Sequence, residues 1–423
     1  MDLEFSNDLT QILSNIFPYY LCPKSLHYSR YMLPEKINIE NYQYKLPEEK
    51  IALHPLEPRD SSQLLKYEKG AISHHIFSDI SDLLPENCML VFNQTRVIQA
   101  RLILKKETGA AIEVLLLEPV APSTDVLVTM GSQKSVVWTC MVGNKKRWKD
   151  HESVSFNKVE FSWANRELNH VRLSWNDNRV FAEVLAELGS MPIPPYIKRE
   201  STEKDKEVYQ TVYAQNDGSV AAPTAGLHFT KQVFEHLAAK SIHTEFITLH
   251  VGAGTFKPVT TENALDHEMH AEKIFFTKEN LARFVQHQGA IIPVGTTSMR
   301  SLESLYWFGV GLLQDRLKAF VIPQYFPYEK SVEIPMNEAM QAVMDYMEAN
   351  HLESIQGTTS IYIVPGYTFR VCRGIVTNFH QPGSTLLLLI SALIGDQWKD
   401  VYAEALENDY RFLSFGDSSL LLP

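Results

Sequence analysis

A change in residue pattern, from helical periodicity to short β-rich runs, between about residues 100 and 178 constrains the fold of this 423-residue chain more than any other feature. Short β-rich runs follow one another there, turn residues such as Gly143–Asn144 separate them, and helical periodicity is missing. Regularly spaced short strands are typical of a small antiparallel barrel or sandwich. The expected strands are Ile112–Leu117, Asp125–Met130, Val136–Val142, Val159–Trp163 and Val171–Trp175.

Helical periodicity returns directly after this segment. Apolar residues recur at i, i+3, i+4 and i+7 from Phe181 to Leu188, with Asn178 as the expected N-cap and Gly189 at the end. Further along the chain, a predicted helix, a buried strand and a second helix follow in order, and a second strand-to-helix junction comes later. These elements are Glu279–Gln288, Ala290–Val294 and Thr296–Trp307, followed by Gly374–Thr377 and Ser384–Ile394.

This order of elements predicts an α/β fold with two domains, in which a small antiparallel β-barrel is inserted into an α/β catalytic domain. The barrel is expected over residues 98–178, and the discontinuous α/β domain over residues 39–97 and 179–423. Residues 1–38 are interpreted as an N-terminal extension. An acidic, methionine-containing helical insert is expected at about 329–356.

Composition limits the class of protein. The net charge of −11 disfavours nucleic-acid binding by the whole surface, so such a partner needs a local basic patch. Lys145–Lys149 and Lys198–Arg199 are candidates, although each taken alone is more typical of a solvated loop. Four scattered cysteines, an acidic N-terminus and an apolar run of only Leu386–Leu393 predict a cytoplasmic protein without a membrane span.

Two runs of small residues mark a candidate ligand site. Val220–Phe229 and Leu249–Phe256 are rich in alanine and glycine, and each carries a histidine near a hydroxyl. Glycine lets the backbone approach a ligand closely while a titratable group stays within reach. A dinucleotide fingerprint is rejected for Gly252-x-Gly254, because the third glycine is missing and Pro258 does not suit the expected helix.

The two strand-to-helix junctions carry polar residues. In Val294–Arg300 a strand runs into Gly-Thr-Thr-Ser and a helix, whose first-turn amides could hold a carboxylate or phosphate. Plain N-capping by Thr296 or Thr297, with Arg300 solvated, explains the same residues. Thr377–Thr385 repeats the pattern around His380, and a simple capping loop is again the alternative.

Other polar clusters are less specific. His267–Glu272 has a His-x-x-His spacing, but no further ligand is obvious, so no metal is predicted and His270 or Glu272 is interpreted as an acid/base or hydrogen-bonding group. Arg59–Ser62 is either a site element or an Asp-capped turn with its own ion pair. Asn93–Arg96 is expected to form a polar loop near the barrel.

Nine ordered segments together resemble the S-adenosylmethionine:tRNA ribosyltransferase-isomerase family of queuosine biosynthesis. The resemblance covers about residues 39 to 423. Residues 1–38 and about 310–356 depart from shorter members, as do Gln63, Gln99, Gln381 and Lys273. The matching segments are His54–Leu65, Val91–Leu102, Met191–Glu200, Tyr209–Phe229, Thr248–Val259, Met269–Glu272, Val294–Ser304, Thr377–Leu386 and Glu407–Gly416.

The resemblance implies that S-adenosylmethionine is a co-substrate that donates its ribosyl group, with no prosthetic group involved. The implied acceptor is 7-aminomethyl-7-deazaguanine at the wobble position of a tRNA with a GUN anticodon, and the implied products are epoxyqueuosine-tRNA, adenine and methionine. A monomer is expected. Two alternatives stay open: a paralogue that acts on a free base or small amine, and a non-catalytic nucleoside- or tRNA-binding module.

The chemistry suggests roles within these segments. A sulfonium acidifies the adjacent 5′-carbon, and a positioned histidine could remove that proton, an effect worth roughly 10²–10⁴-fold in rate. Candidate bases are His228, His250, His270 and His380, with Asp60 and Glu272 as further candidates. Candidate substrate contacts are Arg59, Arg96, Thr224, Gly226, Gly252, Gly254, Thr255, Thr296, Thr297, Ser298, Arg300 and Asn378, and candidate tRNA contacts also include Arg101, Lys198 and Arg199.

Overall fold

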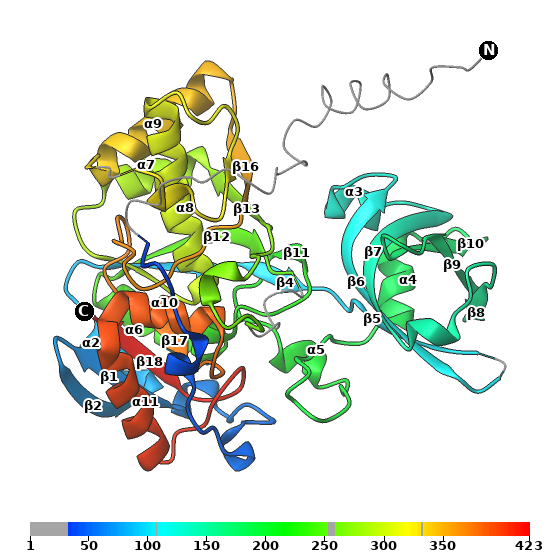
Figure 1. Ribbon diagram of the computed structural model, residues 1–423, viewed down its shortest axis with the longest axis horizontal. Helices are drawn as coiled ribbons and strands as arrows, with labels where there is room; N and C mark the ends of the chain where they lie inside the picture. The colour runs from blue at the N-terminus through cyan, green and yellow to red at the C-terminus, as the bar shows by residue number, and fades with distance from the viewer. Residues whose placement is uncertain (1–32, 107, 253–258, 331–332) are drawn as a thin grey trace.

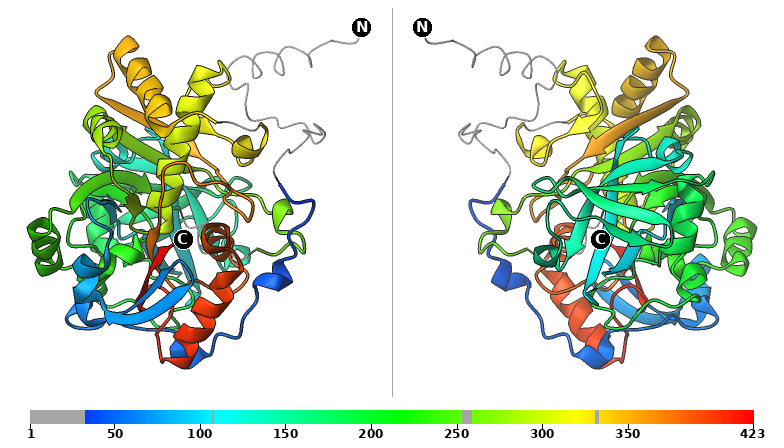
Figure 2. Two further views of the ribbon diagram at one scale, coloured as in Figure 1. Left: turned by 90° about the vertical axis from the view of Figure 1, so that its left-hand side faces the viewer. Right: turned by 90° about the vertical axis from the view of Figure 1, so that its right-hand side faces the viewer.

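The computed structural model describes residues 33–106, 108–252, 259–330 and 333–423. Figure 1 shows two parts, a larger mixed α/β part and a smaller β-rich part beside it. In the right-hand view of Figure 2 the smaller part lies in front of the larger one. The α/β class and the antiparallel sheet that the sequence predicts are both present.

The smaller part is a nearly closed antiparallel barrel. Its six strands follow the order β5-β6-β7-β10-β9-β8. The outer strands β5 and β8 contact each other, which nearly closes the barrel. Directly after β5, Lys106 Nζ donates to the Arg147 carbonyl at 2.8 Å. The strands are β5 Arg101–Lys105, β6 Ala111–Ala121, β7 Ser135–Gly143, β8 Val154–Phe156, β9 Val159–Asn165 and β10 His170–Trp175.

Helix α4 (Phe181–Leu188) covers this barrel. Phe181 packs against Trp138 and Trp175, with ring centroids 5.7 and 6.0 Å apart, because the predicted apolar face turns towards the sheet. The helix is confirmed, but the prediction of Asn178 as its cap is wrong. The N-cap is Val180, whose amide donates to Glu183 Oε2 at 2.9 Å.

One expected strand is a helix. Residues 126–130 form α3 (Val126–Met130) because the Asp125 carboxylate accepts hydrogen bonds from the amides of Leu127 and Val128, at 2.8 and 3.2 Å. This N-cap satisfies amides that a strand would have paired with a neighbour. The prediction of a strand at Asp125–Met130 is therefore wrong.

The larger part contains two sheets that meet at one line. The first has the order β14-β3-β12-β13-β16-β15, in which β14, β3 and β12 are parallel, and the second has the order β17-β18-β1-β2. Parallel bridges between Val294 and Val376 and between Ile291 and Cys372 join β14 to β17. The strands are β1 Gln63–Glu68, β2 Ala71–Ile76, β3 Met89–Asn93, β12 His243–His250, β13 Glu272–Thr277, β14 Ile291–Pro293, β15 Val321–Ile322, β16 Ser354–Thr359, β17 Ile375–Asn378 and β18 Ser418–Leu422.

Helices pack beside these sheets (Figure 1). A third, two-stranded sheet pairs two segments that lie far apart in the sequence. β4 (Thr95–Val97) pairs with β11 (Asn216–Ser219) in parallel. The mainly apolar α8 is buried along almost its whole length, which makes it a central element of the core. The helices are α2 Ile80–Leu83, α5 Asp205–Val208, α6 Lys231–Ala239, α7 Lys278–Gln286, α8 Thr296–Leu313, α9 Met336–Ala349, α10 Thr385–Ile394 and α11 Trp398–Glu407.

The acidic helical segment belongs to the core of this part. Ala339 and Met340 of α9 are fully buried, and the Ala339 carbonyl lies 2.0 Å from the point where a Cβ on Gly309 would stand. Glycine at 309 is thus needed for the close approach of α8 and α9. The end of the expected insert, from Ser354, is already part of β16.

In the ranges that the structure describes, no helix is both long and apolar enough to cross a membrane.

Candidate functional site

A cavity opens where the two strand-to-helix junctions lie side by side. β14 leads through Gly295 into α8, and β17 leads through the loop that carries His380 into α10. Ala221–Ala225, Val251 and Leu413–Ser414 complete the walls of about 810 Å³ of empty space, its open mouth included. Ligands in α/β sheets bind at such carboxyl ends of neighbouring strands.

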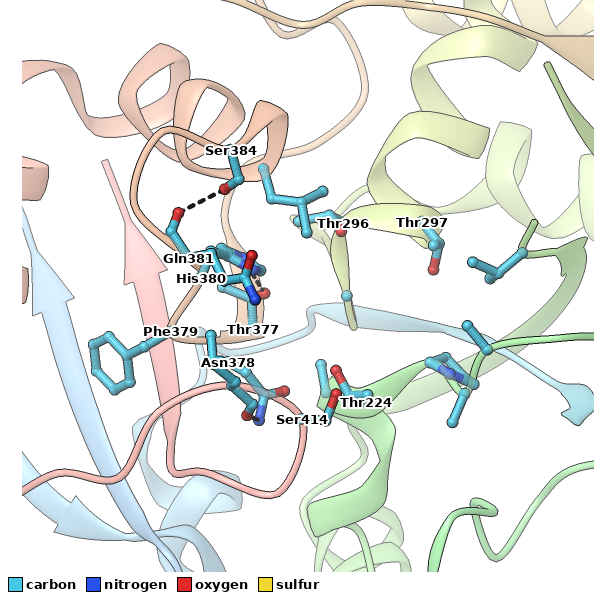
Figure 3. Close-up of a pocket in the computed structure, with 18 of the residues that line it drawn as sticks. Thr224, Thr296, Thr297, Thr377, Asn378, Phe379, His380, Gln381, Ser384 and Ser414 are labelled. Atoms are coloured by element: carbon cyan, nitrogen blue, oxygen red, sulfur yellow. Dashed lines mark hydrogen bonds between the residues drawn. The ribbon is translucent and has the colours of Figure 1, made fainter. Parts of the chain in front are cut away.

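The start of α8 supplies one wall. Gly295 has φ 88°, which lets the strand turn sharply into the helix, and Thr296 and Thr297 line the cavity. Figure 3 shows both threonines across from the loop with Asn378 and His380. Thr297 is 9% exposed and its Oγ1 has no partner within the described ranges, whereas Ser298 Oγ donates back to the Val294 carbonyl at 2.9 Å. The helix start thus offers unpaired amides and one hydroxyl to an anion.

Arg300 is not part of these walls. Its guanidinium forms a buried ion pair with Glu272 through Nη1, and its Nε donates to the Ile361 carbonyl at 3.3 Å. Both side chains are less than 10% exposed. The structure therefore brings Arg300 and Glu272 together as a pair within the protein, and the alternative of a solvated Arg300 is wrong.

His380 is the one of the four candidate histidines that lines the cavity. Its Nε2 lies 3.1 Å from Thr377 Oγ1, and its backbone amide donates to the Tyr402 hydroxyl at 3.0 Å. The Tyr44 hydroxyl donates to its carbonyl oxygen. Burial lowers the pKa of His380 to about 3, so the imidazole is neutral at physiological pH.

His228 lies behind the cavity wall with both ring nitrogens occupied. Nδ1 is 2.7 Å from Ser62 Oγ, Nε2 is 3.2 Å from Asn378 Nδ2, and the ring stacks on Phe77. Burial, with the nearby charges of Arg411 and Arg59, lowers the pKa of His228 to about 3. This histidine contacts the site through Asn378.

The other two histidines lie elsewhere. His250 lines a second cavity between α3 and β12, with Nδ1 3.1 Å from Thr95 Oγ1. Burial, and to a lesser degree Lys273, lower the pKa of His250 to about 4. His270 is exposed and lies outside the walls of the first cavity.

Arg59 and Asp60 make hydrogen bonds within the protein, beside α5 and α6. Arg59 donates to the carbonyls of Gln210 and Glu207 at 2.6 and 2.9 Å, at the end of α5. Asp60 accepts from the hydroxyl of Thr230, the N-cap of α6, at 2.6 Å. The two do not form the ion pair with each other that the turn interpretation expected.

The glycines and Thr224 differ in position. Thr224 lines the cavity, but Gly226 packs against Tyr213, whose hydroxyl oxygen lies 1.9 Å from the point where a Cβ would stand. Gly252 faces open space. Gly254 and Thr255 lie outside the described residues.

Most of the basic residues expected to contact tRNA already form ion pairs with carboxylates of the protein. Arg101 pairs with Glu113 at 2.7 Å, and Lys198 pairs with Glu48 at 2.6 Å. Arg199 makes two hydrogen bonds of 2.7 Å with the buried Asp205. Arg96 is exposed.

Two hydroxyl residues of the cavity were not singled out from the sequence. Tyr196 and Ser414 line it, and their hydroxyl oxygens lie 2.5 Å apart. Both stand inside segments that carried the family resemblance, so these segments were the available signal.

Within the described ranges, no group of three or more His, Cys, Asp or Glu side chains is arranged to hold a metal ion.

The fold and the cavity define an α/β protein with a ligand site at the carboxyl ends of adjoining strands and a small barrel beside it. The family model described as queuosine biosynthesis protein matches residues 39–421. The chain therefore belongs to the queuosine biosynthesis protein family.

Two relatives agree with this membership, and a solved structure is also similar to the chain. S-adenosylmethionine:tRNA ribosyltransferase-isomerases from Desulfitobacterium hafniense and Staphylococcus haemolyticus are each 38% identical to this chain, over 91% of it and 100% of their own length. The crystal structure of an S-adenosylmethionine tRNA ribosyltransferase from Thermotoga maritima is 26% identical. It covers 90% of this chain and 100% of that one, with a TM-score of 0.44.

Proposed function

We propose that this protein transfers and isomerises the ribosyl group of S-adenosylmethionine onto 7-aminomethyl-7-deazaguanine at the wobble position of tRNAs with a GUN anticodon. The products are epoxyqueuosine-tRNA, adenine and methionine. Family membership and 38% identity to two S-adenosylmethionine:tRNA ribosyltransferase-isomerases support this activity. A monomer in the cytoplasm, using no prosthetic group, fits the same proposal.

The observation that carries the proposal is that two helix starts and a neutral histidine meet in one cavity, whose described lining residues include no Asp, Glu, Lys or Arg. The first-turn amides of α8, with Thr297 Oγ1, suit the carboxylate of the donor's methionine moiety. α10 begins at the opposite wall, where the Ser384 hydroxyl caps it by accepting from the Leu387 amide at 3.2 Å. The alanines between them offer an apolar surface for adenine.

His380 is our candidate for the group that removes the 5′-proton. It is the candidate histidine that lines the cavity, and its neutral form can accept a proton. Its low pKa makes it a weak base, so the proposal requires the sulfonium to acidify the carbon strongly. We expect His380→Gln to lower kcat by about 10²-fold or more while the Kd for S-adenosylmethionine changes little.

The barrel is our candidate for a tRNA contact. Residues 98–178 carry 11 Lys and Arg against 9 Asp and Glu, whereas the whole chain has a net charge of −11. Of the cations suggested from the sequence, the exposed Arg96 is the best placed for a phosphate. We also propose that the inserted domain extends from residue 98 to Leu188, because α4 packs on the barrel.

The decisive experiment incubates the protein with S-adenosylmethionine and tRNA that carries the deazaguanine precursor. Release of adenine and methionine in equal amounts, with a matching mass gain of the tRNA, is the expected result. Turnover with the free deazaguanine amine but not with the tRNA would instead identify a small-molecule enzyme. Absence of product from both acceptors would refute the proposed function.

A further inference from the structure

Asn378, at the end of β17, lines the cavity and carries a buried acceptor. The residue is 3% exposed, and its Oδ1 has no hydrogen-bond partner among the residues that the structure describes. Buried carbonyl oxygens are rarely left unpaired, because the loss of their hydration is not repaid. An acceptor in this position indicates a bound group that donates to it.

The amide nitrogen of Asn378 is fixed on the other side. Nδ2 donates to the Leu413 carbonyl at 3.1 Å and lies 3.2 Å from His228 Nε2. A carbonyl can only accept, so turning the amide over would set two acceptors against each other. The Leu413 carbonyl therefore fixes which end of the amide is Nδ2 and leaves Oδ1 as the end without a partner among the described residues.

The proton position on His228 follows from this arrangement. Nε2 faces an N–H donor and must be the unprotonated nitrogen, so the ring proton is on Nδ1 and donates to Ser62 Oγ at 2.7 Å. Phe77 holds the ring by stacking at 4.9 Å. The low pKa of His228 keeps the ring in this neutral form. Neither Ser62 nor His228 lines the cavity.

The chemistry of the walls favours a neutral donor opposite Asn378 Oδ1. Among the described residues that line this cavity, none is Asp, Glu, Lys or Arg. In the proposed pose the methionine ammonium lies beside its own carboxylate at the start of α8, across the cavity from Asn378, whereas an O–H or a neutral N–H of the nucleoside needs only one acceptor. S-adenosylmethionine offers such donors in its ribosyl hydroxyls and in its adenine amino group.

We propose that Asn378 Oδ1 accepts a hydrogen bond from the nucleoside of S-adenosylmethionine, and that His228 and Ser62 are positioning residues that keep this oxygen turned towards the ligand. This inference rests on the proposed function. It gives His228 a role in donor recognition rather than in proton removal, because both of its ring nitrogens are used inside the protein.

The test is calorimetric titration of the purified full-length protein with S-adenosylmethionine and three analogues. These are the 2′-deoxy and 3′-deoxy compounds and the compound that lacks the adenine amino group. We expect the wild type to bind one analogue about tenfold or more weakly than S-adenosylmethionine, which identifies the donating group. Asn378→Leu should bind S-adenosylmethionine and that analogue equally weakly. An Asn378→Leu protein that retains the wild-type Kd would overturn the inference.

Ser62→Ala tests the positioning role from outside the cavity. Loss of Ser62 Oγ removes the acceptor of the Nδ1 proton, so the ring can take the other tautomer and release the Asn378 amide. As for Asn378→Leu, we expect Ser62→Ala to bind S-adenosylmethionine as weakly as it binds that analogue. Ser62→Thr should restore the affinity for S-adenosylmethionine. An unchanged Kd for S-adenosylmethionine in Ser62→Ala would show that the hydrogen bonds from Ser62 through His228 to Asn378 have no part in recognition.

Asn280→Leu is the matched control. Asn280 is 6% exposed, donates to Glu245 Oε1 at 2.6 Å and to the Phe246 carbonyl at 3.1 Å, and lies outside this cavity. It should lower stability without changing the Kd. Product release by the wild type with precursor tRNA tests the proposed function separately. Active wild type with an unaffected Asn378→Leu would defeat only the present inference.

Discussion

Replacement of Arg300 by Met separates a structural role of this arginine from a role in donor binding. The side chain is 8% exposed and its Nη1 pairs with Glu272, which is 4% exposed. Removing one member of a buried ion pair typically costs about 3–5 kcal/mol, because the remaining charge loses its compensation. With a urea m-value of about 3 kcal/mol per M, the unfolding midpoint should fall by about 1–1.7 M.

The assay is urea unfolding followed by fluorescence, with Arg300→Met and Glu272→Gln measured singly and together. The double variant should be more stable than the sum of the single losses predicts, because the two side chains act as a pair. Direct binding of the donor's carboxylate by Arg300 would give a different result: a raised KM for S-adenosylmethionine with an unchanged midpoint. That outcome would refute the structural argument.

Three further predictions concern other residues. His380 has a folded-state pKa lowered to about 3 by burial, so the unfolded chain takes up its proton first and stability falls as pH drops from about 6.5 towards 3. At pH 5 this amounts to about 2 kcal/mol, and urea titration of His380→Gln should show a shallower decline. Gly226→Ala should destabilise by about 1–3 kcal/mol because of the Tyr213 hydroxyl, and adding Tyr213→Phe should recover part of the loss in thermal unfolding. Burial alone would raise the pKa of Asp205, but hydrogen bonds from Arg199 and neighbouring groups hold it below its ordinary value. The stabilisation is therefore complete above about pH 3.9 and is lost as pH falls lower, so Asp205→Asn should flatten the acid limb of stability.

Local pattern was a good guide where each element is specified by nearby residues. The apolar spacing of Phe181 to Leu188 predicted α4, and Ser384 before an apolar run predicted the start of α10. The pattern failed at Asp125–Met130, where an apolar run looked like a strand. The Asp125 carboxylate capped it as a helix, a choice that depends on side-chain geometry rather than on periodicity.

The candidate site could be predicted in its segments but not in its contacts. Both strand-to-helix junctions were expected to bind ligands, and they do line one cavity. Of the four histidines, sequence offered no means of choice, because their differences arise from burial and from distant partners. Arg300 looked like an anion ligand because the residue that neutralises it, Glu272, stands 28 positions earlier in the chain.

The sequence by itself determined the family, the α/β class with an antiparallel barrel, and the segments around the site, because these depend on short-range order along the chain. Tertiary structure alone decided which polar residues line the cavity and which are hydrogen-bonded inside the protein. Ser62, His228 and Asn378 lie up to 316 positions apart, and only the packing of β1, β17 and their loops brings their polar atoms within 2.7–3.2 Å. The direction of a hydrogen bond is fixed by such contacts, and no local pattern encodes it.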